Sequence, residues 1–118
     1  MIEAFNMHRD DIVGFRIDGT ISQLDLKPLM KVLKEKLKLY NTLRLYVEYV
    51  DLNGFSIDTL LEELTYNFGE LDKFEKGVIL TATDNIRQAH QLAQSVDGIH
   101  LKSFHYSERD KAYQWIEE

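Results

Sequence analysis

The sequence predicts an α/β fold in which a single mixed β-sheet of about five strands packs against four helices. Segments rich in β-forming residues alternate with amphipathic segments of helical period. The chain also starts with two strand-like segments joined by the polar turn "HRDD". We therefore expect an N-terminal antiparallel hairpin followed by the order β-α-β-α-β-α. Strands that alternate with helices pair in parallel through right-handed crossovers, so one sheet should contain them all.

The size and composition of the chain indicate one globular domain over residues 1–118. Hydrophobic residues make up 44% of the sequence and charged residues 29%. There is no cysteine, which excludes disulfides, thiolate catalysis and Cys-based zinc sites. The start, "MIEAFNMHRDD", lacks the basic and apolar regions of a signal peptide, and no apolar run approaches the ~20 residues of a membrane span. We expect a cytoplasmic protein without a transmembrane segment.

The first half of the chain contains three predicted strands and two predicted helices. The hairpin is "IEAFNM" and "IVGFRIDG", and a capping box from Ser22 to Asp25 opens the first helix. "LRLYVEYV" is a nearly continuous apolar run, as expected for a strand covered on both faces. The second helix spans 55–71. Apolar stripes of helical period support both helices: Leu26, Leu29, Met30, Leu33, Leu37 and Tyr40 in the first, and Ile57, Leu60, Leu61, Leu64, Phe68 and Leu71 in the second.

The second half repeats the pattern with two more strands and two more helices. "GVILTAT" is a buried type of strand, "DNIRQAHQLAQSV" a helix and "IHLKSFHY" a last strand. The final helix, "SERDKAYQWIEE", is expected to open with a second capping box, from Ser107 to Asp110.

Three stretches carry a resemblance to a known family: "VGFRIDGTIS", "LRLYVEY" with "GFS" at the start of the following helix, and "LDKFEKGVILTATDNIRQA". With these, nearly the whole chain resembles the SpoIIAA-like branch of the STAS superfamily (STAS/SEC14-like), small bacterial proteins related to anti-sigma-factor antagonists. Phe74 and Asp84 match the family pattern, whereas Ile86 stands where an aromatic residue is usual. The resemblance implies a non-enzymatic domain without a cofactor. Relatives switch partners by serine phosphorylation or are suggested to bind lipid-like or nucleotide ligands.

The first functional hypothesis is a small apolar or lipid-like ligand bound between the sheet and the first two helices. Phe55, in the loop after Gly54, and Phe68 are candidates to line such a pocket, although core packing is the default for Phe68. Sites in parallel sheets gather beyond the carboxyl ends of the strands, where Asn53 and Thr83 are expected.

The second hypothesis is a protein-interaction or partner-switch role for the second helix. Tyr66 lies ~180° from the apolar stripe, with Glu62 and Glu70 one turn on either side. Exposed aromatic side chains are enriched at the centres of protein interfaces. The partner could also be a second copy, since a homodimer through an apolar helix face fits this pattern.

Ser56 is the candidate phosphosite for the switch hypothesis. It stands at a strand-to-helix junction, like the switch serine of the phosphorylated antagonists, but "FSID" lacks the Asp before the serine and the Gly two residues after it. A helix cap is the favoured interpretation, because a serine hydroxyl accepts from free N–H groups of the first turn.

A hydrolase using Ser56, His105 and an Asp is a distant third hypothesis, since the nucleophile elbow G-x-S-x-G is absent. We assign no catalytic residue.

The charge pattern disfavours nucleic acid and marks one basic region. The net charge is −6, whereas nucleic-acid binders are typically basic. Residues 27–44 contain six basic residues and one acidic residue, a net charge of +5. The rest of the chain contains 8 basic and 19 acidic residues, a net charge of −11. Four lysines of the first helix fall within ~60° and form a solvated face or a stripe for an acidic partner or anionic lipid headgroups: Lys27, Lys31, Lys34 and Lys38. The histidines show no metal-ligand spacing, so no metal site is predicted.

Overall fold

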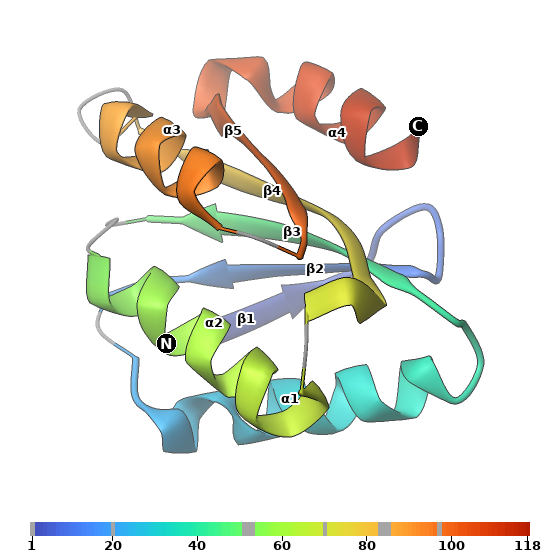
Figure 1. The fold of residues 1–118 in the computed structure, drawn as a ribbon. Coiled ribbons are helices and arrows are strands. Elements are labelled where there is room, and N and C mark those ends of the chain that lie inside the picture. The colour runs from blue at the N-terminus through green and yellow to red at the C-terminus, as the bar shows by residue number, and fades with distance from the viewer. Residues whose placement is uncertain (1, 20, 51–53, 70, 83–85, 97) are drawn as a thin grey trace.

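A five-stranded mixed sheet runs through the centre of the molecule (Figure 1). The computed structural model describes residues 2–19, 21–50, 54–69, 71–82, 86–96 and 98–118, and the side chains of residues 54–58 lie outside that description. The strands are β1 (Ile2–Phe5), β2 (Ile12–Ile17), β3 (Leu43–Tyr49), β4 (Phe74–Thr81) and β5 (His100–His105), and they lie side by side in that order. β1 pairs with β2 in antiparallel fashion and the other pairs are parallel, which confirms the predicted hairpin and mixed sheet.

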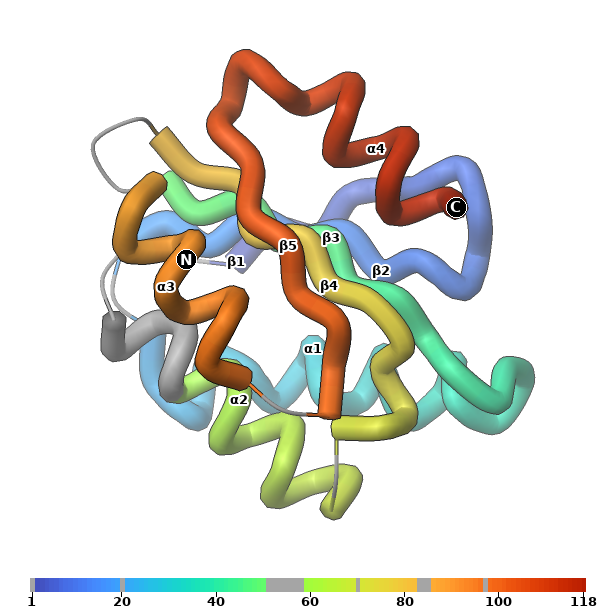
Figure 2. Tube along the Cα trace, turned by 45° about the horizontal axis from the view of Figure 1, so that its top comes forward, coloured from blue at the N-terminus to red at the C-terminus, as the bar shows by residue number. Residues whose placement is uncertain are grey.

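The helices divide between the two faces of the sheet (Figures 1 and 2). α1 (Gln23–Leu37), α2 (Gly54–Phe68) and α3 (Ile86–Ser95) cover one face, and α4 (Arg109–Glu117) covers the other. Short 3₁₀ turns precede β4 (η1, Leu71–Lys73) and α4 (η3, Tyr106–Glu108). Among the described residues, no helix is long and apolar enough to cross a membrane.

Alternation along the strands produces two separate hydrophobic cores. In β3, Leu45, Val47 and Tyr49 point into the core under α1, α2 and α3, while Tyr46 points into the core under α4. All seven residues of β3 are buried, as its apolar run predicts. Arg44 and Glu48 share the α4 face with Tyr46, so this buried strand also carries two charges.

The hairpin closes tightly over β2 at Gly14. A Cβ atom at this position would lie 2.7 Å from Met7 Sδ and 2.7 Å from Phe5 Cε2. A larger residue at position 14 would therefore force the ends of the Phe5 and Met7 side chains to shift, and glycine lets both pack directly over the strand.

The two helix starts that the sequence assigned to capping boxes have different outcomes. Ser22 caps α1 as predicted, accepting from the N–H of Asp25 while Asp25 accepts from the N–H of Ser22. The box predicted from Ser107 to Asp110 is wrong. His105 and Glu108 form the box instead, around the turn η3, and α4 begins at Arg109. The imidazole of His105 accepts from the N–H of Ser107, so the chain turns once before the α-helix starts.

Candidate functional site

A groove of about 350 Å³ runs between α1 and α2 on the outer side of the helix layer. It is lined by Lys27, Met30, Lys31 and Lys34 of α1 and by Glu63, Tyr66 and Asn67 of α2. Tyr66 is 85% exposed, which is unusual for so large an aromatic side chain. On the α2 wall, the amide of Asn67 donates to the backbone carbonyl of Glu63 (2.8 Å) and to its carboxylate (3.3 Å).

This groove brings together two sets of residues that the sequence suggested separately. Lys27, Lys31 and Lys34 of the lysine stripe lie in the same groove as Tyr66. Lys38 is not part of it and forms an ion pair with Glu35 at 3.4 Å. Glu62 is exposed on α2 without lining the groove, and Glu70 lies outside the described residues.

The outer side of α1 carries apolar side chains that sequence reasoning missed. Leu24 is 68% exposed, Val32 is 44% exposed and Leu39, just after the helix, is 73% exposed. The signal was present in the sequence, because all three positions fall outside the buried stripe of this helix when counted at ~100° per residue.

The space proposed for a small ligand contains an apolar cavity of about 20 Å³ beneath α2. Its walls come from β3, β4, β5, α2 and Ile99, and they include the buried phenol of Tyr49, whose pKa is raised by burial. Phe68 packs edge-on against Phe74, with ring centroids 5.4 Å apart, at the border of the larger core. The other candidates for this site lie outside the described positions and side chains: Asn53, Phe55 and Thr83, and with them the candidate phosphosite Ser56.

A hydroxyl without a partner lies at the carboxyl end of β4. Thr81 is fully buried, and its Oγ1 has no hydrogen-bond partner in the described part of the structure. An unpaired buried hydroxyl costs about 1–3 kcal/mol, so such groups are rare in native proteins. This strand end is one of those at which the sequence placed a ligand site.

A polar network crosses the opposite face of the sheet. The carboxylate of Glu48 accepts from Arg109 Nη2 at 2.9 Å, from Arg16 Nη2 at 3.3 Å and from the hydroxyl of Tyr46 at 3.3 Å. Burial, and then the charge of Glu48, raises the pKa of Tyr46 far above its ordinary value. Each charge in this network has a partner of opposite sign, which is typical of a structural arrangement.

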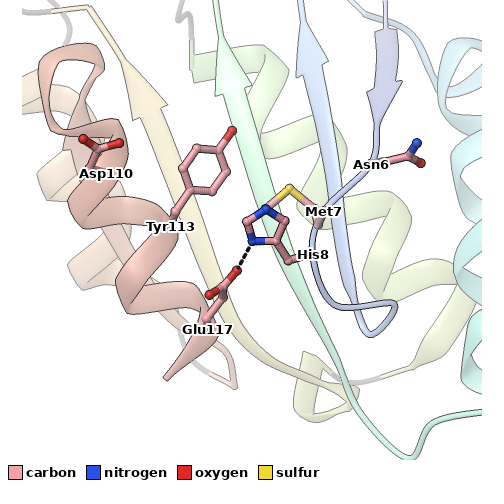
Figure 3. A pocket seen from close by; sticks show the side chains of 6 residues that line it. All are labelled: Asn6, Met7, His8, Asp110, Tyr113 and Glu117. Atoms are coloured by element: carbon pink, nitrogen blue, oxygen red, sulfur yellow. Dashed lines mark ion pairs between the residues drawn. The ribbon is translucent and has the colours of Figure 1, made fainter.

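A second groove, of about 400 Å³, lies between the β1–β2 connection and α4 (Figure 3). It is lined by Asn6, Met7 and His8 on one side and by Asp110, Tyr113 and Glu117 on the other. His8 Nδ1 is 3.3 Å from Glu117 Oε1, and the Tyr113 ring stacks on the ring of Tyr46 at 4.9 Å. The groove is mildly acidic. No group of three His, Cys, Asp or Glu able to hold a metal ion occurs within the described residues.

The described histidines are engaged in local contacts. His90 Nδ1 contacts the hydroxyl of Ser103, and His100 packs edge-on against Trp115 at 5.3 Å. His105 caps the turn η3 and lies 2.7 Å from Ser107 Oγ. His105 is the histidine of the hydrolase hypothesis, and its ring is therefore engaged in contacts within its own turn.

The chain was compared with known protein families, curated proteins and solved structures. The family model described as SpoIIAA-like matches residues 12–117, which is nearly the whole chain. The searches among curated proteins and among solved structures returned no match. The mixed five-stranded sheet with four helices agrees with the fold of that family. On this match and this fold, the chain belongs to the SpoIIAA-like (STAS) family.

Proposed function

We propose that this protein is a non-catalytic interaction module that binds a partner across the groove between α1 and α2. The observation that carries the proposal is Tyr66, which stands 85% exposed at the wall of a 350 Å³ groove with three lysines on the other side. An aromatic side chain beside a hollow of this size supplies the apolar anchor typical of interface centres. Membership of the SpoIIAA-like family supports the proposal, since such domains act by contacting partners.

The size of the internal cavity is the reason to place this function ahead of ligand binding. Pockets for small molecules measure about 300–1,000 Å³. The cavity beneath α2 measures about 20 Å³, which is room for about one water molecule. A ligand under α2 would require this helix to move away from the sheet, whereas the outer groove is already open.

The test is site-specific photocrosslinking in the cells in which the protein works, which we place in the bacterial cytoplasm. A benzophenone amino acid replaces Tyr66 in one strain and replaces Gln94, an exposed residue of α3, in the control strain. We expect light-dependent adducts of one defined mass from position 66 and none from position 94. Absence of adducts at position 66, or equal adducts at both positions, would overturn the proposal. An adduct of two copies would identify the partner as a second molecule of this chain.

A small apolar or lipid-like ligand is the second candidate function. Two observations favour it: the walls of the cavity beneath α2 are apolar, and the buried hydroxyl of Thr81, at the adjoining strand end, has no partner among the described residues. The residues proposed for this site remain Asn53, Phe55, Phe68 and Thr83.

Native mass spectrometry of protein purified from its own host tests this candidate. A mass excess that disappears on denaturation indicates a bound ligand, and its loss in Phe55→Ala places the ligand near that residue. An excess equal to one phosphate group that survives denaturation supports Ser56 as a switch, with Ser56→Ala as the control. A clean mass in both states contradicts both the ligand and the switch.

A further inference from the structure

The outer side of α1 combines exposed apolar side chains with a row of lysines. Leu24 and Val32 lie about 80° apart around α1 at ~100° per residue, on the side of the helix that faces away from the core, and Leu39 lies two residues beyond its last residue. Their exposed fractions are 68%, 44% and 73%. Three large apolar side chains exposed along α1 and its C-terminal turn, next to a row of lysines, form the amphipathic pattern of a contact surface.

The lysine row follows the flank of α1 that borders α2. Lys27, Lys31 and Lys34 are exposed, and none of the three forms an ion pair or hydrogen bond with another described residue. Two acids of α1, Asp25 and Glu35, lie on the side that carries the apolar residues when counted at ~100° per residue. Both have local partners, since Asp25 accepts from the N–H of Ser22 in the capping box and Glu35 pairs with Lys38 at 3.4 Å. The positive charge of the row is thus available to an anionic partner.

We infer that α1 docks the protein on the surface of an anionic lipid bilayer. This inference rests on the proposed function, because it names the partner of the α1 side of the same groove. The lysines lie at the level of the headgroups, Leu24, Val32 and Leu39 enter the border of the acyl region, and Tyr66 lies at the interface. Apolar side chains flanked by lysines are the pattern by which helices lie on membranes without crossing them.

The shape of the surface favours a bilayer over an acidic protein. Leu24 and Leu39 lie near the two ends of α1, whose 15 residues measure about 22 Å at 1.5 Å per residue, so the apolar side chains are spread along the helix and do not form a cluster. α1 also lies along the lower border of the helix layer in Figure 1, and among the described elements none is drawn beneath it. A convex helix with widely spaced apolar side chains fits the deformable surface of a bilayer, whereas a protein partner would need a separate pocket for each of these side chains.

The charge distribution of the whole chain orients the molecule on such a surface. Residues 23–38, which form α1 and its C-cap, contain five lysines against Asp25 and Glu35 (+3), and the remaining residues contain 9 bases and 18 acids (−9). An anionic bilayer attracts the first region and repels the second, so the protein should approach with α1 foremost.

Vesicle co-sedimentation tests the inference with the full chain. One set of vesicles is pure phosphatidylcholine, and in the other about a third of the lipid is phosphatidylglycerol. We expect binding to the second set alone, weakening as salt shortens the range of the attraction. Each lysine near an anionic surface strengthens binding roughly fivefold, so Lys27→Gln/Lys31→Gln/Lys34→Gln should weaken it about a hundredfold.

Two further variants make the test specific. Arg87→Gln/Lys102→Gln/Lys111→Gln removes the same charge from α3, β5 and α4 and should leave binding within about twofold, because these residues lie outside α1. Leu24→Gln/Leu39→Gln keeps every charge and should weaken binding roughly tenfold, since two apolar side chains no longer enter the bilayer. The circular dichroism spectrum checks that each variant is folded.

The outcomes that overturn the inference are distinct from those that overturn the proposed function. Absence of binding to anionic vesicles, equal binding to both vesicle types, or an equal loss in the two charge variants rejects the bilayer. Binding to soluble polyglutamate with no binding to vesicles rejects the bilayer in favour of an acidic protein. If vesicle binding is absent but position 66 still crosslinks to a protein, the bilayer inference is rejected and the proposed interaction function is retained. If position 66 gives no adduct of any class, both fail.

Discussion

Glu48 is a buried carboxylate whose place in the sheet depends on three other side chains. Its side chain is 4% exposed, and it accepts hydrogen bonds from Arg16, Arg109 and Tyr46. Burial of an unpaired charge is costly, so the two guanidinium groups are a condition for folding with this residue in β3. Arg16 comes from β2 and Arg109 from α4, so the side chain of Glu48 links β2, β3 and α4 by hydrogen bonds.

We predict that Glu48→Gln lowers the free energy of unfolding by about 2 kcal/mol. Glutamine keeps the volume but removes the charge that pairs with both arginines. The loss stays below that of a fully buried pair, because the Arg16 and Arg109 side chains are each 44% exposed and can be hydrated. Urea denaturation measures the change, with exposed Glu62→Gln as the control. A loss equal to that of the control would show that the network does not contribute to stability.

Single residues also mark the limit of what the sequence can predict. The cap at Ser22 was predictable because a capping box is local, involving two residues three positions apart. The cap at His105 was not predictable, since a histidine cap has no common sequence pattern, and the sequence pointed to Ser107 in the same turn instead. The strand that contains Arg44 and Glu48 was predicted as a nearly continuous apolar run, and only the partners of these two charges on other elements explain why both are buried.

At the scale of the element, α4 is fixed by cations at its C-terminal end. Arg9 donates to the carbonyl of Glu117 at 2.8 Å, Arg44 to that of Ile116 at 2.7 Å and Lys76 to that of Trp115 at 3.1 Å. The last carbonyls of a helix have no partner within it and form the negative end of its dipole. Three bases from the hairpin, β3 and β4 satisfy them, and α4 is thereby held on a face that no other helix of the described structure covers.

We predict that Arg44→Met lowers the free energy of unfolding by about 2 kcal/mol and loosens α4 selectively. Methionine retains the apolar stem packing, but it leaves the Ile116 carbonyl without its donor and Glu75 without its ion pair. Hydrogen exchange should accelerate in residues 109–117 more than in α1. Arg87→Met, at an exposed position of α3, is the matched control. Uniform acceleration over all helices would contradict the anchoring role.

Element type and order were predictable because they depend on periodicity, whereas the arrangement of the elements was not. The helical stripes of Leu33 and Leu64 identified α1 and α2 from local spacing. The groove between these helices depends on their separation, which follows from side-chain packing across both of them and the sheet. That is why Lys27 and Tyr66, far apart in the sequence, could be proposed singly but not as one site.

At the scale of the whole molecule, the two cores of the described residues lie on opposite faces of one shared sheet. α1, α2 and α3 bury one core and α4 buries the other, and the alternating side chains of β2, β3 and β4 contribute to both. The sequence predicted the sheet and its helices but not which face each helix covers. Whether the two cores unfold together can be measured, because the only tryptophan, Trp115, packs against the core under α4 and reports on that side alone.

We predict that Leu64→Ala shifts the unfolding of the distant α4 side as much as that of its own core. Leu64 is fully buried beneath α2, and its truncation should cost about 3 kcal/mol by leaving a void beside the existing cavity. If the sheet couples the two cores, Trp115 fluorescence and far-ultraviolet circular dichroism will give the same urea midpoint, lowered equally in the variant. Leu24→Ala, 68% exposed on α1, should change neither signal. A fluorescence midpoint that stays in place while the circular dichroism midpoint falls would mean that α4 and its face unfold independently of the three-helix core.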